Sequence, residues 1–118
     1  MGVHHEKPLG WVGDSYEVLK SFPKRARREL GHALEQVQRG DEPSSWKPRS
    51  DIGPGVIQLM AQAGTGSYRI FYVAKLDDVV WVLHAFQKKT AETSRIDVES
   101  GRAAYDALIR RMESQRGR

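Results

Sequence analysis

The sequence contains no cysteine, which excludes disulfide bonds and thiolate zinc sites and fits a reducing compartment. No apolar run approaches the ~20 residues that a membrane-spanning helix needs. The first ten residues, MGVHHEKPLG, also lack the apolar core of a signal peptide. These absences predict a protein that stays in the cytoplasm and has no membrane partner.

Metal and cofactor motifs are missing as well. His4 and His5 are adjacent but have no further ligands beside them, so they do not form a metal site. The segment Gly64-Thr65-Gly66 lacks the lysine and the helix of a phosphate-binding loop, which leaves it as a turn. We therefore expect no metal and no cofactor.

The composition is that of an ordinary globular protein, with more lysine and arginine than aspartate and glutamate. Of the 118 residues, 39% are hydrophobic and 29% are charged, which fits a single domain over residues 1–118. Residues 1–7 and 113–118 are expected to be flexible ends, the latter a basic tail. The formal net charge of +4 makes nucleic acid or another acidic partner plausible.

The first half of the chain predicts one short strand and two helices. Residues 9–12 form a short extended segment that suits an edge strand. Asp14 and Glu17 have the spacing of a capping box, which predicts a short helix to about Ser21. An apolar stripe with a period near 3.6 residues predicts a second helix over 23–39. The two helices form a hairpin with one apolar face.

The second half predicts a meander of three strands and a last helix. Residues 41–55 hold three of the five prolines and are predicted to be a loop. Aromatic and β-branched runs with short connections then predict antiparallel strands, and Ser94 with Asp97 marks a helix start. The expected strands are 56–62, 68–74 and 79–86, and the expected helix is 95–115. The order β-α-α-β-β-β-α indicates an α+β domain whose helices cover one face of a small antiparallel sheet.

Cations converge at one end of the predicted hairpin. Alternation places Arg69 opposite Tyr68, Ile70 and Tyr72, on the face that the helices leave open. Lys88 and Lys89 follow the next strand at the same end, so the three cations are either a phosphate clamp or solvated surface residues. Neighbouring cations lower the pKa of a lysine, which would let Lys88 or Lys89 act as a general base.

Two further residues on that strand leave alternatives open. Gln87 could donate to a phosphate or a base edge, or be an ordinary exposed glutamine. His84 alternates with Val80, Val82 and Phe86, which fits a half-buried structural histidine, with a catalytic role as the alternative. No serine, histidine and aspartate set with a usable context for nucleophilic catalysis is present.

Several segments together resemble the RelE/HigB toxin superfamily, in particular its phage-derived HigB-like branch. The similar segments are YRIFYV, VLHAFQKKT and RIDVESGRAAY, with KPLGWVGDSYEVLKSFP and the WKP-containing loop upstream. The resemblance spans most of residues 7–110 and implies a RelE-like fold. It further implies a type II toxin that cleaves mRNA, typically on the ribosome, and that a small helix-turn-helix (HigA-like) antitoxin neutralises.

The resemblance also implies roles for single residues. Arg69 and Lys89 match positions that contact or activate the scissile phosphate, and Lys88 lies beside them. Lys47 matches a loop lysine that binds the RNA backbone. We expect Lys89 to matter more for cleavage and Lys88 more for backbone contact. Further RNA-binding candidates are Gln87, Arg49 and Arg95.

The central strand departs from the pattern of many relatives. Gln58-Leu59-Met60 stands where they carry a Glu-Leu-Arg type sequence, so a cation that the family often uses is absent at Met60. Losing one preorganised charge can cost ~10²–10³ in rate. The alternative reading is therefore a weak or inactive module that binds RNA or the antitoxin on the same fold. A phage-derived structural or accessory protein is a third possibility.

Overall fold

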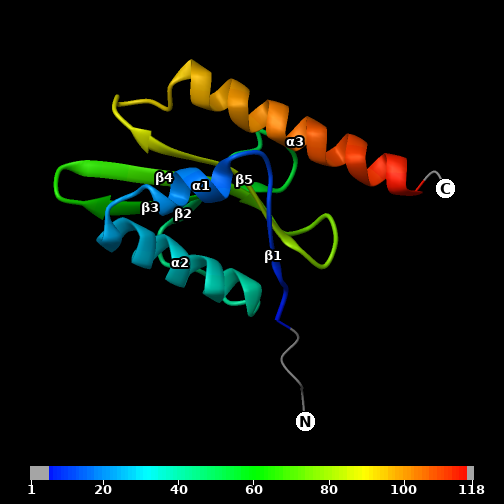
Figure 1. The fold of residues 1–118 in the computed structure, drawn as a ribbon, viewed down its shortest axis with the longest axis horizontal. Helices are drawn as coiled ribbons and strands as arrows, with labels where there is room; N and C mark the ends of the chain where they lie inside the picture. The colour runs from blue at the N-terminus through cyan, green and yellow to red at the C-terminus, as the bar shows by residue number, and fades with distance from the viewer. Residues whose placement is uncertain (1–5, 117–118) are drawn as a thin grey trace, which may run out of the picture.

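The computed structural model describes residues 6–116, which form a three-layered α/β/α arrangement (Figure 1). The order of elements is β-α-α-β-β-β-β-α. The strands are β1 (Leu9–Trp11), β2 (Trp46–Pro48), β3 (Val56–Ala63), β4 (Gly66–Val73) and β5 (Val80–Lys88). The helices are α1 (Ser15–Lys20), α2 (Lys24–Gln38) and α3 (Arg95–Arg116).

The five strands form one mixed sheet in the order β1-β5-β4-β3-β2. The predicted meander is confirmed, because β3, β4 and β5 pair antiparallel. β1 pairs parallel with β5, so the sheet is mixed rather than wholly antiparallel. The predicted loop 41–55 contains one short strand, β2, which pairs with β3 at the far edge.

Helices cover both faces of this sheet. α1 and α2 pack on one face over a core that includes Leu30, Leu59 and Ile70. α3 packs on the opposite face, where Leu108 joins a second core with Phe71 and Val73. The predicted helical hairpin on one face is confirmed. The expectation that all helices share one face is wrong, since α3 takes the other.

A register shift between Phe71 and Tyr72 interrupts the alternation of β5. Phe71 pairs with His84 and Tyr72 pairs with Val82, which leaves Leu83 as an extra residue. A bulge of this kind turns the following side chains to the other face. Val82 therefore faces the α1–α2 side, whereas Phe86 belongs to the core beneath α3.

The helix starts differ in how they are capped. Ser94 accepts a hydrogen bond from the backbone N–H of Asp97 at 3.2 Å, which confirms the predicted start of α3. Asp14 precedes α1 as predicted but makes no side-chain cap hydrogen bond. The predicted capping box there is therefore wrong, although the helix itself is present.

The ends of the chain are more ordered than expected over the described residues. The Nζ of Lys7 donates to the Ala74 carbonyl at 2.7 Å, and its backbone N–H donates to the Gln38 carbonyl at 2.9 Å. Residues 113–116, expected to begin a flexible tail, continue α3. Residues 1–5 and 117–118 lie outside the described residues. Among the described helices, none has the length and apolar character needed to cross a bilayer.

Candidate nucleic-acid interface

Four cationic side chains gather at one end of the sheet, on the α3 side, where Arg69 shares the face of Phe71 and Val73. We define this cation cluster as Lys47, Arg49, Arg69 and Lys88. Arg69 on β4 lies between Met60 of β3 and Phe86 of β5 in the register. Lys88 follows Phe86 at alternate spacing and therefore faces the same side. Residues from three separate segments of the chain thus meet in one place.

Arg49 is held in place by hydrogen bonds to three neighbouring side chains. Its Nε and Nη2 donate to the two carboxylate oxygens of Asp51 at 2.9 and 2.8 Å. Its Nη1 donates to Gln58 Oε1 at 2.7 Å and to Thr93 Oγ1 at 3.0 Å. The guanidinium also lies 5.2 Å from the ring centre of Phe71. The arginine is buried, so its structural bonds occupy most of the donors that RNA would use.

Lys88 sits in the field of the other three cations. Partial burial, followed by the charges of Arg69, Lys47 and Arg49, lowers the pKa of the Lys88 ammonium. Burial and the charge of Arg49 lower the pKa of Arg69 too. A guanidinium nevertheless stays protonated near neutrality. The cluster therefore combines a permanent cation with a lysine that gives up its proton more readily than usual.

A small open cavity lies within this cluster. Its volume is about 400 Å³, and its lining includes Lys47, Arg49, Lys88 and Thr93. Asp51 and Glu92 also line it, but Asp51 is paired with Arg49 at 2.8 Å. The hydrogen bonds from Arg49 lower the pKa of the Asp51 carboxyl. The cavity consequently favours an anion such as a phosphate group.

Replacing Arg49 with methionine should destabilise the fold more than it affects RNA directly. The change leaves the buried amide oxygen of Gln58 without its donor, which costs about 2 kcal/mol. Urea unfolding measures this loss. Arg95→Met is the matched control, because Arg95 is exposed and, among the described residues, forms an ion pair with Glu99 alone, at 3.5 Å. An Arg49→Met protein as stable as Arg95→Met would show that Arg49 does not anchor the cluster.

The structure does not bring all predicted site residues into the cluster. Gln87 pairs with Tyr68 and shares its face, on the α1–α2 side. Lys89 lines a separate cavity with Gln87 and Tyr68. Arg95 lies at the start of α3 in an exposed ion pair with Glu99. Of the seven predicted residues, the structure gathers Lys47, Arg49, Arg69 and Lys88.

His84 takes part in a chain of polar contacts that the sequence did not suggest. Its Nε2 lies 2.8 Å from Asp97 Oδ1, and the Ser94 hydroxyl donates to Asp97 Oδ2 at 2.6 Å. Its ring stacks on Phe86 with the centres 5.3 Å apart. These contacts tie the start of α3 to β5 and support the structural interpretation of His84. Only the β5 bulge brings His84 to this face, and the strand pattern gave no sign of it.

The absent central-strand cation leaves an apolar neighbour beside Arg69. Met60 pairs with Arg69 in the register, and both line a second small cavity with Ser45 and Glu29. The Nε of Arg69 donates to the Ser67 hydroxyl at 3.0 Å. Within the described part of the chain, the Arg69 guanidinium makes no other protein hydrogen bond. Its remaining donors are therefore open to a ligand.

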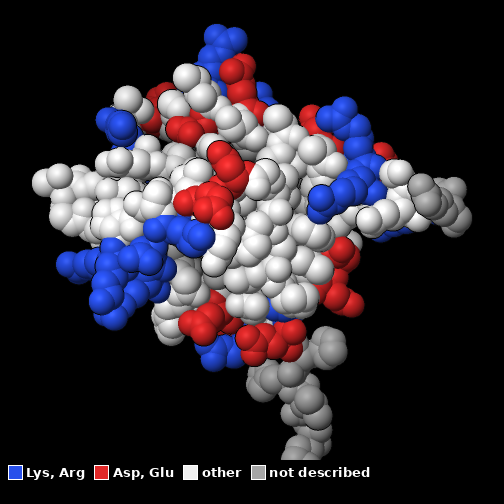
Figure 2. Space-filling model, viewed as in Figure 1, with Lys and Arg blue, Asp and Glu red and all other residues white. Residues whose placement is uncertain are grey.

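A second basic region lies apart from the cluster. Figure 2 shows lysine and arginine side chains gathered over the start of α2. The exposed residues at this position are Lys24, Arg25, Arg27 and Arg28. This region belongs to the helical face away from α3. It suits a solvated helix surface, and it contributes nothing to the cavity at the cation cluster.

Comparison with known families identifies the chain. A family model described as phage-derived protein Gp49-like matches residues 17–106, which include most of the sheet and the cation cluster. The chain belongs to this Gp49-like family. The Gp49-like family is a toxin family of the RelE/HigB type. Searches of curated proteins and of solved structures found no match.

Proposed function

We propose that this Gp49-like protein is the toxin of a toxin–antitoxin pair and cleaves mRNA, on the ribosome, in the cytoplasm. The observation that carries the proposal is a cavity lined by Lys47, Arg49 and Lys88, with Arg69 near enough for its charge to act on Lys88. A pocket that concentrates cations suits the charge that develops on a phosphate during transfer. A small helix-turn-helix antitoxin would neutralise the toxin.

The reaction needs a base and a cation, and the cluster offers both. Neutral Lys88 would remove the proton from a ribose 2′-hydroxyl, whose oxygen then attacks the adjacent phosphorus. The bond from phosphorus to the 5′-oxygen breaks, which leaves a 2′,3′-cyclic phosphate and a 5′-hydroxyl once the leaving oxygen gains a proton. Arg69 would hold the phosphate oxygens in line and stabilise their added charge.

Induced expression tests the proposal directly. We expect growth arrest, together with new mRNA fragments that carry 5′-hydroxyl ends and map inside translated regions. The alternative function is a module that binds RNA or the antitoxin without cutting. It is favoured by Met60, which leaves the central strand without a cation beside Arg69. Growth arrest without 5′-hydroxyl fragments would support that alternative and exclude the nuclease.

Cleavage is expected to continue without a divalent metal and to fall steeply with salt. The cation cluster can supply the charge that a metal would otherwise provide. Each phosphate that it neutralises on a single strand contributes about −0.7 to the slope of log affinity against log salt. Cleavage of RNA by the purified protein in excess chelator, and at increasing salt, measures both effects. Reactions that contain ribosomes are run separately, because ribosomes need magnesium. Loss of cleavage in chelator, restored by a divalent ion, would contradict the scheme.

A further inference from the structure

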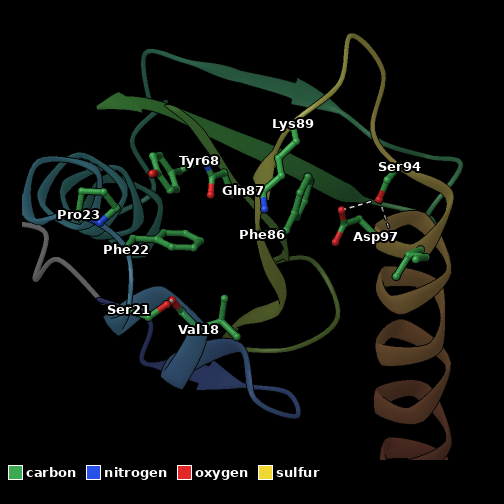
Figure 3. A pocket seen from close by; sticks show the side chains of 11 residues that line it. Val18, Ser21, Phe22, Pro23, Tyr68, Phe86, Gln87, Lys89, Ser94 and Asp97 are labelled. Carbon is green, nitrogen blue, oxygen red and sulfur yellow. Dashed lines mark hydrogen bonds between the residues drawn. The ribbon is translucent and has the colours of Figure 1, made fainter. Parts of the chain in front are cut away.

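A larger hollow lies beside the cation cluster, at the open edge of β5. β1 pairs only with Val80, Trp81 and Val82, so the last residues of β5 have no strand on that side. The hollow has a volume of about 740 Å³ and opens between the α1–α2 hairpin and the start of α3 (Figure 3). We call it the aromatic hollow and define it by Phe22, Tyr68, Phe86, Gln87, Lys89 and Asp97.

The wall of the aromatic hollow combines flat apolar groups with a few polar ones. Phe22 and Tyr68 lie with their ring centres 4.9 Å apart. Figure 3 shows Gln87 beside these rings and Asp97 across the hollow on α3. The exposed Gln87 amide offers both a donor and an acceptor. A nucleobase has the same two properties, a flat apolar body and an edge of donors and acceptors.

The aromatic hollow and the cavity of the cation cluster differ in charge, and this difference determines which part of an RNA each can bind. Lys89 and Asp97 both line the aromatic hollow, so a cation and an anion face the same space. The Asp97 carboxylate is fixed there by His84 at 2.8 Å and Ser94 at 2.6 Å. The negative charge of this carboxylate would repel a phosphate, whereas it would not repel an uncharged base. The phosphate therefore belongs in the cation cluster and the base in the hollow.

The end of β5 connects the two cavities. Lys88 faces the cluster and Lys89 lines the hollow, and consecutive Cα atoms are only ~3.8 Å apart. An RNA strand that crosses this end can leave its scissile phosphate at Lys88 while a neighbouring nucleotide turns its base toward Gln87. Unstacked bases of single-stranded RNA are commonly read in this way, against aromatic rings and by hydrogen bonds to their edges.

We propose that the aromatic hollow binds one unstacked base next to the cleaved phosphate, and that Gln87 determines which base is preferred. This inference rests on the proposed function. It assigns sequence preference to a cavity at the open edge of β5, separate from the cavity of the cation cluster. Gln87 acts here as a specificity residue, and Lys89 holds the backbone that leads into the hollow.

The test compares cleavage sites in a purified translation reaction with ribosomes and mRNA. Fragments with 5′-hydroxyl ends are sequenced for wild type, Gln87→Ala, Gln87→Glu and the control Gln62→Ala. Gln62 is an exposed glutamine on β3 that lies outside the hollow. We expect wild type to prefer one base about tenfold at a single position near the cut. Gln87→Ala should reduce this preference to about twofold, and Gln62→Ala should keep it.

Gln87→Glu distinguishes recognition from a structural effect. A carboxylate only accepts hydrogen bonds, so the preferred base should change toward one that offers an amino group, such as cytosine. A loss of folding would not produce a new preference. Unchanged base preference in both Gln87 variants would overturn the inference and leave the hollow for another partner, such as a protein segment. Absence of any cleavage by wild type would instead overturn the proposed function.

Discussion

Replacing Arg69 with alanine is expected to abolish toxicity and to lower RNA cleavage by about 10²–10³. The arginine belongs to the cation cluster, and among the described residues its guanidinium makes one protein hydrogen bond, to the Ser67 hydroxyl at 3.0 Å. Its other donors can grip phosphate oxygens, and with Met60 beside it no neighbouring cation on β3 takes over this role. Single-turnover cleavage of mRNA measures the effect.

The fold should survive this change, which makes the experiment interpretable. Losing the single hydrogen bond to Ser67 costs about 1 kcal/mol, so Arg69→Ala should unfold at nearly the wild-type urea concentration. Arg39→Ala is a suitable control, because Arg39 is an exposed arginine at the end of α2. An Arg69→Ala protein that remains fully toxic would remove Arg69 from the proposed site.

Lys88 and Lys89 are expected to differ strongly in their contributions to cleavage. The sequence led us to expect cleavage to depend more on Lys89, whereas the geometry favours Lys88, because the cation cluster surrounds it. Lys88→Met should reduce cleavage at least a hundredfold. Lys89→Met should mainly weaken RNA binding and cost about tenfold. The opposite order would support the expectation drawn from the sequence.

The charge-conserving variant separates proton transfer from attraction. Lys88→Arg keeps a cation in the cluster but cannot accept a proton near neutrality, so RNA binding should persist while cleavage stays low. In wild type the rate should rise with pH and level off below the ordinary lysine value of 10.5, because the pKa of Lys88 is lowered. A wild-type cleavage rate for Lys88→Arg would show that Lys88 acts only through its charge.

The strand pattern predicted much of this fold because alternation of side chains is local information. Tyr68, Ile70 and Tyr72 do share a face, and Arg69 lies opposite them. The β5 bulge was not predictable in this way, since Leu83 reads as one more apolar residue in a continuous run. This extra residue decides which of the two adjacent lysines faces Arg69. The sequence placed Lys88 and Lys89 at the same end of the sheet and favoured Lys89 for cleavage, because the pattern did not show that Lys88 is the one that faces Arg69.

Long-range contacts explain the other differences. The network of Arg49 joins residues that are 2, 9 and 44 positions away in the chain, and no local pattern indicates such partners. The position of α3 is likewise set by the second core around Phe71, which forms only when the sheet has assembled. Composition and spacing thus predicted the candidate cations, while tertiary packing determined which of them have donors left for a ligand.

The end of β5 also has a consequence for how the target preference of such a protein could change during evolution. The final residues of this strand are divided between two cavities, since Lys88 lines the cavity of the cation cluster and Phe86, Gln87 and Lys89 line the aromatic hollow. Gln87 does not line the cavity of Lys88, so under the proposed function a substitution at Gln87 would change the choice of target between descendants while the cutting chemistry is inherited unchanged.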